Sequence, residues 1–158
     1  MKNTVLPISL QFYYNSSYKD RNYGYGLGFS MGEEMRYALS LSGDSVTIER
    51  GDGRSDLYLK KDQGYEAPTG AVSYTHLTLP TKDGTIYRFE NAEHKRVTKI
   101  ENRSGLVTTL QYQPDGLLTG VSDNAGRSLA LTYTDGLLTK ATGSFIQGEI
   151  SYQYDSRK

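Results

Sequence analysis

The second half of the chain repeats itself at an interval of 21 residues. Tyr112 and Tyr133 are separated by this interval, and so are Gly105 and Gly126. The series continues from Tyr133 to Tyr154. A short supersecondary unit that recurs at a fixed period cannot bury its apolar face alone, so copies of it stack on one another. The repeat therefore predicts an array of similar units rather than an irregular globular domain.

Each unit reads as a strand, a tight turn and a second strand. The turn Asp115-Gly116-Leu117-Leu118-Thr119 recurs as Asp135-Gly136-Leu137-Leu138-Thr139 at an interval of 20, so one residue is missing before the second aspartate. Asp-Gly favours a hairpin turn because glycine adopts a positive φ without steric cost. The residues that define the repeat are Tyr112, Asp115, Gly116, Tyr133, Asp135, Gly136, Tyr154 and Asp155.

The first half carries strand signals of the same kind. Between residues 35 and 60 we predict a three-stranded meander, broken by the turn glycines Gly43, Gly51 and Gly53. The pairs whose alternation indicates these strands are Met35 with Tyr37, Leu39 with Leu41, Val46 with Ile48, and Leu57 with Leu59. With 14 tyrosines and 17 glycines in 158 residues, the composition also favours many short strands. The fold class we predict is all-β, an antiparallel meander of hairpin repeats forming part of a curved or spiral β-sheet shell.

Composition excludes several function classes. Lysine plus arginine and aspartate plus glutamate both number 18 and are mixed along the chain, so nothing favours nucleic acid or an anionic membrane as partner. The absence of cysteine removes disulfides and thiolate chemistry. No segment approaches 18 apolar residues, and the apolar stretch within residues 1–11 is short and interrupted by Pro7. We therefore expect no membrane insertion and no signal peptide in this chain.

The sequence predicts no catalytic residue, metal site or cofactor. Its two histidines are His76 and His94, and His94 stands in a polar turn where a solvated side chain is the default. The run Gly24 to Gly28 lacks the Lys-Ser/Thr of a phosphate loop, which favours a bend or bulge. Glu33 and Glu34 precede a strand and are interpreted as a solvated edge.

Tyrosines of the first half suggest one binding function. Exposed tyrosines on a sheet stack on sugar rings, although packing in a core or across strands is their commoner use. The candidates for glycan stacking are Tyr13, Tyr14, Tyr23 and Tyr25. A carbohydrate-binding surface module is accordingly one alternative function, and a hydrolase with an unrecognised site is a second.

The repeats resemble those of Rhs or YD-repeat proteins. The resemblance rests on Leu129–Tyr133, on Asp135–Lys140, on the connector Asp123–Arg127, and on Tyr152–Asp155. It covers residues 82 to 158, which we interpret as YD-type hairpin repeats. Residues 1 to 81 resemble the amino-terminal segment of the family more loosely, at Leu6–Leu10, Tyr13–Ser17 and Gly24–Ser30, and lack the tryptophan that the family usually has there.

The resemblance implies a non-catalytic structural segment of a secreted or cell-surface bacterial protein. In that family the strands build a hollow casing that encloses a carboxy-terminal toxin or effector. The implied partner is the remainder of the same polypeptide, with glycans as a further candidate. Because the strand at residues 151 to 154 would leave an open sheet edge, we also predict edge-to-edge self-association.

Residues 72 to 81 differ from the rest. Val72-Ser73-Tyr74-Thr75-His76-Leu77-Thr78-Leu79-Pro80-Thr81 resembles one reading frame of a transposase-type sequencing-library adapter. The alternation of Val72, Tyr74, His76 and Thr78 nevertheless predicts a short strand, which Pro80 would end.

Overall fold

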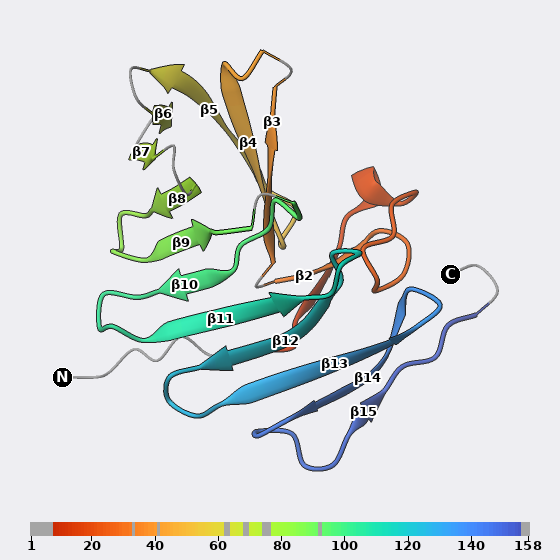
Figure 1. Cartoon of the computed structure of the whole chain (residues 1–158). Coiled ribbons are helices and arrows are strands. Elements are labelled where there is room, and N and C mark those ends of the chain that lie inside the picture. The colour runs from red at the N-terminus through yellow and green to blue at the C-terminus, as the bar shows by residue number, and fades with distance from the viewer. Residues whose placement is uncertain are drawn as a thin grey trace.

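The structure is a computed structural model that describes residues 8–32, 34–40, 42–61, 64–67, 70–73, 77–91 and 93–155. These residues form β-strands, turns and a single 3-10 turn, η1 (Ser16–Tyr18). The predicted all-β class is thus confirmed. The strands build a large sheet and a separate two-stranded one (Figure 1).

The large sheet is an antiparallel meander of thirteen strands in the described part of the chain, and their spatial order is their order in the sequence. The strands are β3 (Met35–Leu39), β4 (Ser45–Arg50), β5 (Ser55–Lys61), β6 (Gly64–Ala67), β7 (Gly70–Ser73), β8 (Leu77–Pro80), β9 (Ile86–Phe89), β10 (Lys99–Glu101), β11 (Val107–Tyr112), β12 (Leu118–Asp123), β13 (Ser128–Thr134), β14 (Leu137–Gly143) and β15 (Ile150–Ser151). The meander predicted for residues 35 to 60 is confirmed as β3, β4 and β5.

Buried and more exposed side chains alternate along β4, β11 and β13. In β13, Leu129 and Leu131 are buried while Ala130 and Thr132 are exposed. β5 also alternates, but the residue that faces the core is Tyr58, whereas Leu57 and Leu59 are 56% and 61% exposed. The register is the reason, since Tyr58 lies opposite the fully buried Val46 and shares its face.

The second repeat unit is one residue shorter than the first, and the difference is accommodated in a turn. Between β11 and β12 the connection has five residues and uses a single left-handed position, Gly116, with φ 84°. Between β13 and β14 it has two, Asp135 and Gly136, with φ values of 51° and 74°. Positive φ at both central residues defines a type I′ hairpin, whose twist matches that of the flanking strands. The shorter unit therefore keeps the register of its strands by changing its turn type.

The first strand of the sheet is bonded to the segment that precedes β10. The Tyr37 N–H donates to the Lys95 carbonyl and the Val97 N–H donates to the Met35 carbonyl, both at 2.8 Å. The Tyr37 ring also meets the Phe89 ring edge-on, with centroids 5.6 Å apart. Two stretches of the sheet that are distant in sequence thus share one core.

Residues 8–32 cover the apolar face of the repeat half. Within them β1 (Phe12–Tyr14) pairs with β2 (Phe29–Met31). The Leu138 N–H donates to the Gly24 carbonyl at 2.7 Å, and the Phe12 ring lies 5.8 Å from that of Tyr152. Figure 1 shows this segment in red and orange beside the ends of β11 to β14. The first and second halves of the chain therefore pack as one unit.

The strand predicted through Val72 and Thr78 is wrong. β7 ends at Ser73 and β8 begins at Leu77, and Ser73 pairs with Thr78 in antiparallel register. The chain therefore reverses there, and residues 74–76, which include Tyr74 and His76, lie outside the described residues. β8 does end at Pro80, as predicted, because proline lacks the N–H that a continuing ladder needs.

Candidate functional site

The glycine run forms a bend that touches the repeats. Gly24, Gly26 and Gly28 have φ values of 97°, 96° and 80°, so all three need the left-handed region. A Cβ on Gly24 would lie 2.6 Å from the Leu117 side chain and 2.9 Å from the Tyr133 ring. The predicted bend is confirmed, and its glycines also allow the backbone to approach the repeat strands closely.

The repeat tyrosines make the same contact one unit apart. The Tyr112 phenol donates to the Val97 carbonyl at 2.9 Å, and the Tyr133 phenol donates to the Leu118 carbonyl at 2.8 Å. Both tyrosines stand at a register shift in their strand. A register shift changes the direction in which a side chain points. This explains how each phenol reaches a carbonyl fifteen residues earlier.

The repeat aspartates act in the turns. The Asp115 carboxylate accepts the Leu117 N–H at 3.0 Å, and Asp135 is the first of the two left-handed residues of the type I′ turn. Tyr154 and Asp155 follow β15 at the end of the described residues. Turn geometry therefore accounts for both Asp-Gly pairs.

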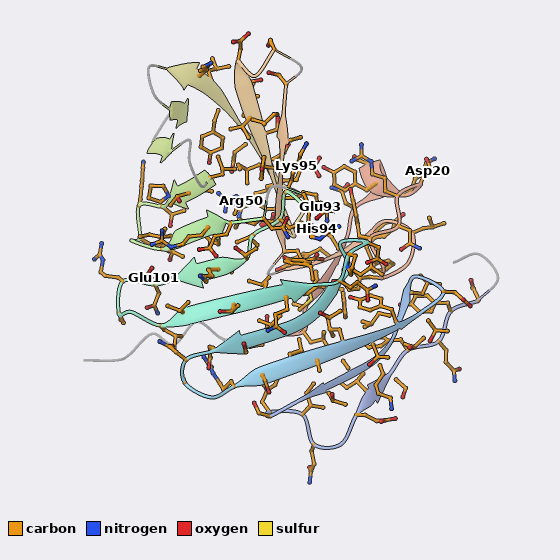
Figure 2. The ribbon with its side chains drawn as sticks, in the orientation of Figure 1. Asp20, Arg50, Glu93, His94, Lys95 and Glu101 are labelled. Atoms are coloured by element: carbon orange, nitrogen blue, oxygen red, sulfur yellow. The ribbon has the colours of Figure 1, made fainter. Side chains whose placement is uncertain are left out.

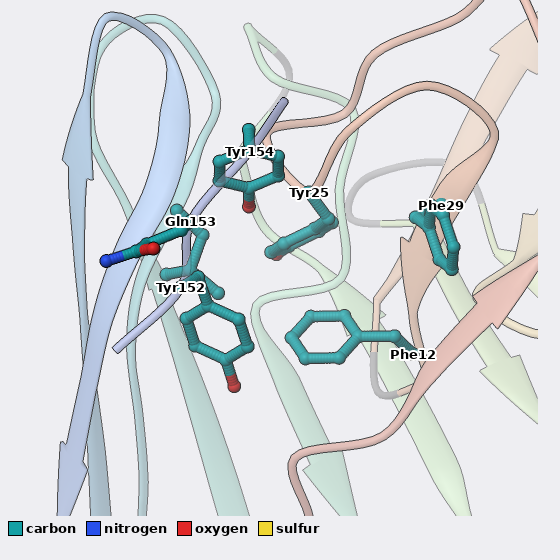
Figure 3. A pocket seen from close by; sticks show the side chains of 7 residues that line it. Phe12, Tyr25, Phe29, Tyr152, Gln153 and Tyr154 are labelled. Carbon is teal, nitrogen blue, oxygen red and sulfur yellow. The ribbon is translucent and has the colours of Figure 1, made fainter. Parts of the chain in front are cut away.

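An aromatic cleft of about 180 Å³ lies between residues 8–32 and the end of the sheet. We refer to it below as the aromatic cleft. The residues that line it are Phe12, Tyr25, Phe29, Leu138, Tyr152, Gln153 and Tyr154. Figure 3 shows Tyr152 and Tyr154 on one side of it and Phe12 and Phe29 on the other. The Phe12 and Tyr25 rings are 5.1 Å apart, so its walls are continuous with the packing between the two halves.

A buried polar cluster lies beside Tyr25. Glu34 is 1% exposed, and its Oε1 accepts a hydrogen bond of 2.7 Å from Nη1 of Arg96. Its Oε2 has no hydrogen-bond partner among the described residues. Burial raises the pKa of Glu34, against the opposing effect of the Arg96 and Arg36 guanidiniums. The interpretation of Glu34 as a solvated edge was wrong, because pairing of Arg36 with Arg96 draws this segment inward; Glu33 lies outside the described residues.

The phenols near Glu34 stay neutral at ordinary pH. Burial, with the nearby Glu34 charge, raises the pKa of Tyr25 and of Tyr112 well above 10.0, and burial also raises the pKa of Tyr133. The Tyr133 and Tyr25 hydroxyls are 3.4 Å apart. These groups are suited to packing and hydrogen bonding rather than to carrying a proton at neutral pH.

The four tyrosines proposed for glycan stacking do not share one platform. Tyr14 is 58% exposed and packs against Phe29 with ring centroids 5.2 Å apart. Tyr25 is buried, Tyr13 is half-buried, and Tyr23 lies beneath the Arg36 guanidinium at 3.6 Å. Of the four, Tyr25 lines the aromatic cleft and Tyr14 stands beside its rim residue Phe29.

His94 lies in the turn between β9 and β10 (Figure 2). The Asn91 side-chain oxygen accepts the N–H groups of Glu93 and His94, and Lys95 takes a positive φ of 52°. The turn stands 21 residues before Asp115-Gly116 and is its counterpart. Within the described ranges, no cluster of three histidine, aspartate or glutamate residues could hold a metal ion, and no helix is long and apolar enough to cross a membrane.

Most of the aromatic cleft was missed from the sequence. The alternation of Tyr152 and Tyr154 was visible and places both rings on one face. Phe12, Phe29 and Leu138 join them only through the packing of residues 8–32 on the sheet, for which the sequence carries no local signal.

Comparison with protein families finds an RHS Repeat at residues 91–128. This span contains β10, β11 and β12, the Asp115-Gly116 turn and the connector to β13. No curated protein matches the chain.

Proposed function

We propose that this chain, which carries an RHS repeat, is a non-catalytic structural segment of a secreted or surface-delivered bacterial Rhs or YD-repeat protein. RHS repeats are typically structural shell elements. The segment contributes strands to a β shell that encloses a carboxy-terminal toxin or effector. The remainder of the same polypeptide is its principal partner.

The strict order of the strands is the observation that supports this proposal. Every neighbour in the large sheet is the next strand in the sequence, so a further hairpin extends the sheet without disturbing it. The recurring contacts of Tyr112 and Tyr133 give each hairpin the same attachment to the one before. In a sheet of this kind the backbone N–H and C=O groups of each strand bond to the neighbouring strands. Its role is to enclose a partner rather than to catalyse a reaction.

Protease protection of a longer polypeptide tests the proposal. The genomic reading frame on both sides is determined, and the polypeptide it encodes is treated with trypsin under native conditions. We expect its carboxy-terminal segment to resist cleavage in the whole protein and to be cut when expressed alone. Equal cleavage in both settings would contradict enclosure.

Self-association through β15 is a second expectation of an extendable sheet. β15 is the outermost strand in the described part of the sheet. Unpaired edges promote pairing with other chains. We expect light scattering to show association that increases with concentration, whereas a sharp monomer at high concentration would count against it.

A carbohydrate-binding surface is the second candidate function. The exposed pair of Tyr14 and Phe29 beside the aromatic cleft favours it, because exposed aromatic rings stack on sugar rings. Glycan arrays would show binding that is lost in Tyr14→Ala. Phe145→Ala is the control, because Phe145 is also exposed and, unlike Tyr14, is not paired with the cleft residue Phe29. Tyr25→Ala is a poor test, since Tyr25 is 6% exposed and supports the core.

The structure gives less support to a hydrolase. A glycosidase needs paired carboxyl groups at its cleft. The residues that line the aromatic cleft include no carboxylate, and Glu34, which is buried nearby, is paired with Arg96.

A further inference from the structure

The dipeptide Asp-Gly occurs four times in the chain, and each copy lies in a turn between two strands of the large sheet. The copies are Asp52-Gly53, Asp83-Gly84, Asp115-Gly116 and Asp135-Gly136. This dipeptide is chemically labile, because glycine has no side chain to keep its backbone nitrogen away from the aspartate carboxyl carbon. Attack of that nitrogen on that carbon closes a five-membered succinimide ring. The surroundings of the two reacting groups in each turn therefore decide where the reaction occurs.

In three of the turns, hydrogen bonds hold both reacting groups. The Gly116 N–H donates to the carbonyl three residues earlier at 2.8 Å, and the Asp115 carboxylate accepts the Leu117 N–H at 3.0 Å. Asp52-Gly53 and Asp83-Gly84 have the same two bonds, from the glycine N–H to the carbonyl three residues earlier and to the carboxylate from the N–H two residues later. These bonds must break before the nitrogen can reach the carboxyl carbon.

Asp135-Gly136 has neither of these bonds. Among the residues that the structure describes, nothing accepts the Gly136 N–H and nothing donates to the Asp135 carboxylate. The short turn is the reason, because the residue two positions after Asp135 is Leu137, which is already the first residue of β14 and pairs with Thr134. Asp135 and Gly136 are also exposed, whereas Gly116 is buried. Both reacting groups of this turn are therefore free and accessible to water.

We propose that Asp135-Gly136 is a site of spontaneous covalent modification, at which Asp135 isomerises to isoaspartate in the folded protein. The Gly136 nitrogen bonds to Cγ of the protonated Asp135 carboxyl, and the nitrogen proton leaves with the carboxyl hydroxyl as water. Water then adds to one of the two carbonyl carbons of the ring. Addition at Cγ breaks the new bond and restores aspartate. Addition at the main-chain carbonyl carbon breaks the original peptide bond, so that the chain continues through the side chain. Water is the only co-reactant.

The modification alters the turn that sets the register of β13 and β14. Isoaspartate lengthens the main chain by one methylene, and a two-residue type I′ turn depends on positive φ at both of its residues. Leu138, the second residue of β14, donates its N–H to the Gly24 carbonyl at 2.7 Å. We therefore expect isomerisation to weaken the attachment of residues 8–32 to the repeats.

Ageing of the whole chain under physiological conditions tests the site. Trypsin releases residues 128–140, in which Asp135-Gly136 is the single Asp-Gly, and residues 104–127, which carry Asp115-Gly116 as an internal control. Isoaspartate is separated from aspartate by reversed-phase chromatography and identified by electron-transfer fragmentation. We expect it to accumulate at Asp135 at least about tenfold faster than at Asp115, because only the latter must first lose hydrogen bonds.

Asparagine variants give a second measurement of the same two turns. Asp135→Asn keeps the type I′ turn, for which Asn-Gly is a preferred sequence, and Asp115→Asn keeps an oxygen that can accept the Leu117 N–H. Closure of the ring then releases ammonia instead of water, and the product differs from the variant in mass. Asp135→Asn should lose its amide at least about tenfold faster than Asp115→Asn in the folded chain. In concentrated guanidinium chloride the two rates should become similar, because the difference comes from the fold.

The contrary outcomes are distinct. Equal rates at Asp135 and Asp115 in the folded chain would overturn the proposal, and so would a lack of isoaspartate at Asp135 over a period in which the unfolded chain acquires it. In the aged chain, exchange of the Leu138 N–H should accelerate, whereas that of the Leu110 N–H, bonded to the Thr98 carbonyl, should not. Unchanged exchange of Leu138 in a chain that contains isoaspartate would overturn the expected effect on residues 8–32.

Discussion

The Tyr133 phenol donates a hydrogen bond to the backbone carbonyl of Leu118 at 2.8 Å, from a strand that pairs directly with the strand of Leu118. Tyr112 makes the same bond to Val97 one repeat earlier. In each case a side chain satisfies a backbone carbonyl, and the tyrosine that donates stands at a register shift of its own strand. The recurrence of tyrosine in the repeat therefore places the same hydrogen bond in each unit, in addition to an apolar face.

Tyr133→Phe should destabilise the fold through the loss of this bond. The ring and its packing remain, so the expected decrease in the free energy of unfolding is about 1 kcal/mol, the net value of one hydrogen bond in a part-buried setting. Urea unfolding followed by circular dichroism measures it. Tyr14→Phe is the control, because Tyr14 is exposed and its change should stay within about 0.5 kcal/mol. Equal effects would show that the bond adds nothing.

The same phenols make the fold sensitive to alkali. Burial raises the pKa of Tyr25, Tyr112 and Tyr133 above the ordinary value of 10.0. The neutral form is thus favoured in the folded state, so this contribution to stability is complete below pH 10.0 and is lost as pH rises above it. Urea midpoints measured between about pH 9 and pH 11.5 should fall, and should fall less steeply in Tyr133→Phe. If the urea midpoints of the natural chain and of Tyr133→Phe fall equally with pH, ionisation of Tyr133 does not contribute to the loss of stability.

Gly24→Ala should loosen the contact between the two halves. Gly24 has a φ of 97°, and a Cβ there would meet the Leu117 side chain at 2.6 Å and the Tyr133 ring at 2.9 Å. Gly43→Ala is the matched control, because Gly43 has a φ of 72° and nothing within 4 Å of the added atom. Both variants carry the backbone cost of about 1 kcal/mol, and Gly24→Ala should cost a further 1 to 3 kcal/mol, roughly, from overpacking.

Hydrogen exchange locates that effect. The Leu138 N–H is bonded to the Gly24 carbonyl, so its exchange should accelerate in Gly24→Ala and stay unchanged in Gly43→Ala. Similar exchange of Leu138 in both variants would mean that the steric contact is relieved elsewhere.

The parts of the fold that follow from local rules were predictable. Asp135-Gly136 and Gly116 predict turns, and the alternation of Val46 and Ile48 predicts a buried strand face. Each of these signals depends on the backbone preference or the spacing of neighbouring residues. The reversal between β7 and β8 was missed because the alternation of Val72 and Thr78 looks the same in one strand as in two.

Features that depend on contacts between distant segments were not predictable. Glu34 and Arg96 are 62 residues apart, and a Glu-Glu pair before a strand is usually solvated. The exposure of Leu57 and burial of Tyr58 likewise follow from the register with β4, which apolarity alone does not fix. Tyr25 was recognised as an aromatic residue of interest, but its burial follows from the packing of residues 8–32 on Tyr133.

The buried pair of Glu34 and Arg96 should be more sensitive to mutation than surface pairs. Glu34→Ala leaves the Arg96 guanidinium without its acceptor in a site where it is 14% exposed, and should cost about 3 kcal/mol or more. Lys140→Ala breaks the pair with Glu149, whose side chain is 50% exposed, and should change the free energy of unfolding by less than about 1 kcal/mol. Urea unfolding at neutral pH compares the two, and similar costs would contradict the burial argument.

Glu34→Gln shows how the charge itself contributes. Glutamine keeps an oxygen that can accept from Arg96 and carries no charge to desolvate. Because burial raises the pKa of Glu34 above 4.5, its contribution to stability is complete below that pH and decreases as pH rises through the folded-state pKa. Tyr25, which also acts on this carboxyl, has a pKa raised well above 10.0 and stays neutral between about pH 4 and pH 7. The stability advantage of the natural chain over Glu34→Gln should therefore shrink across this range. An advantage that grows with pH in urea unfolding would instead mean that attraction to Arg96 and Arg36 outweighs the cost of burying the carboxylate.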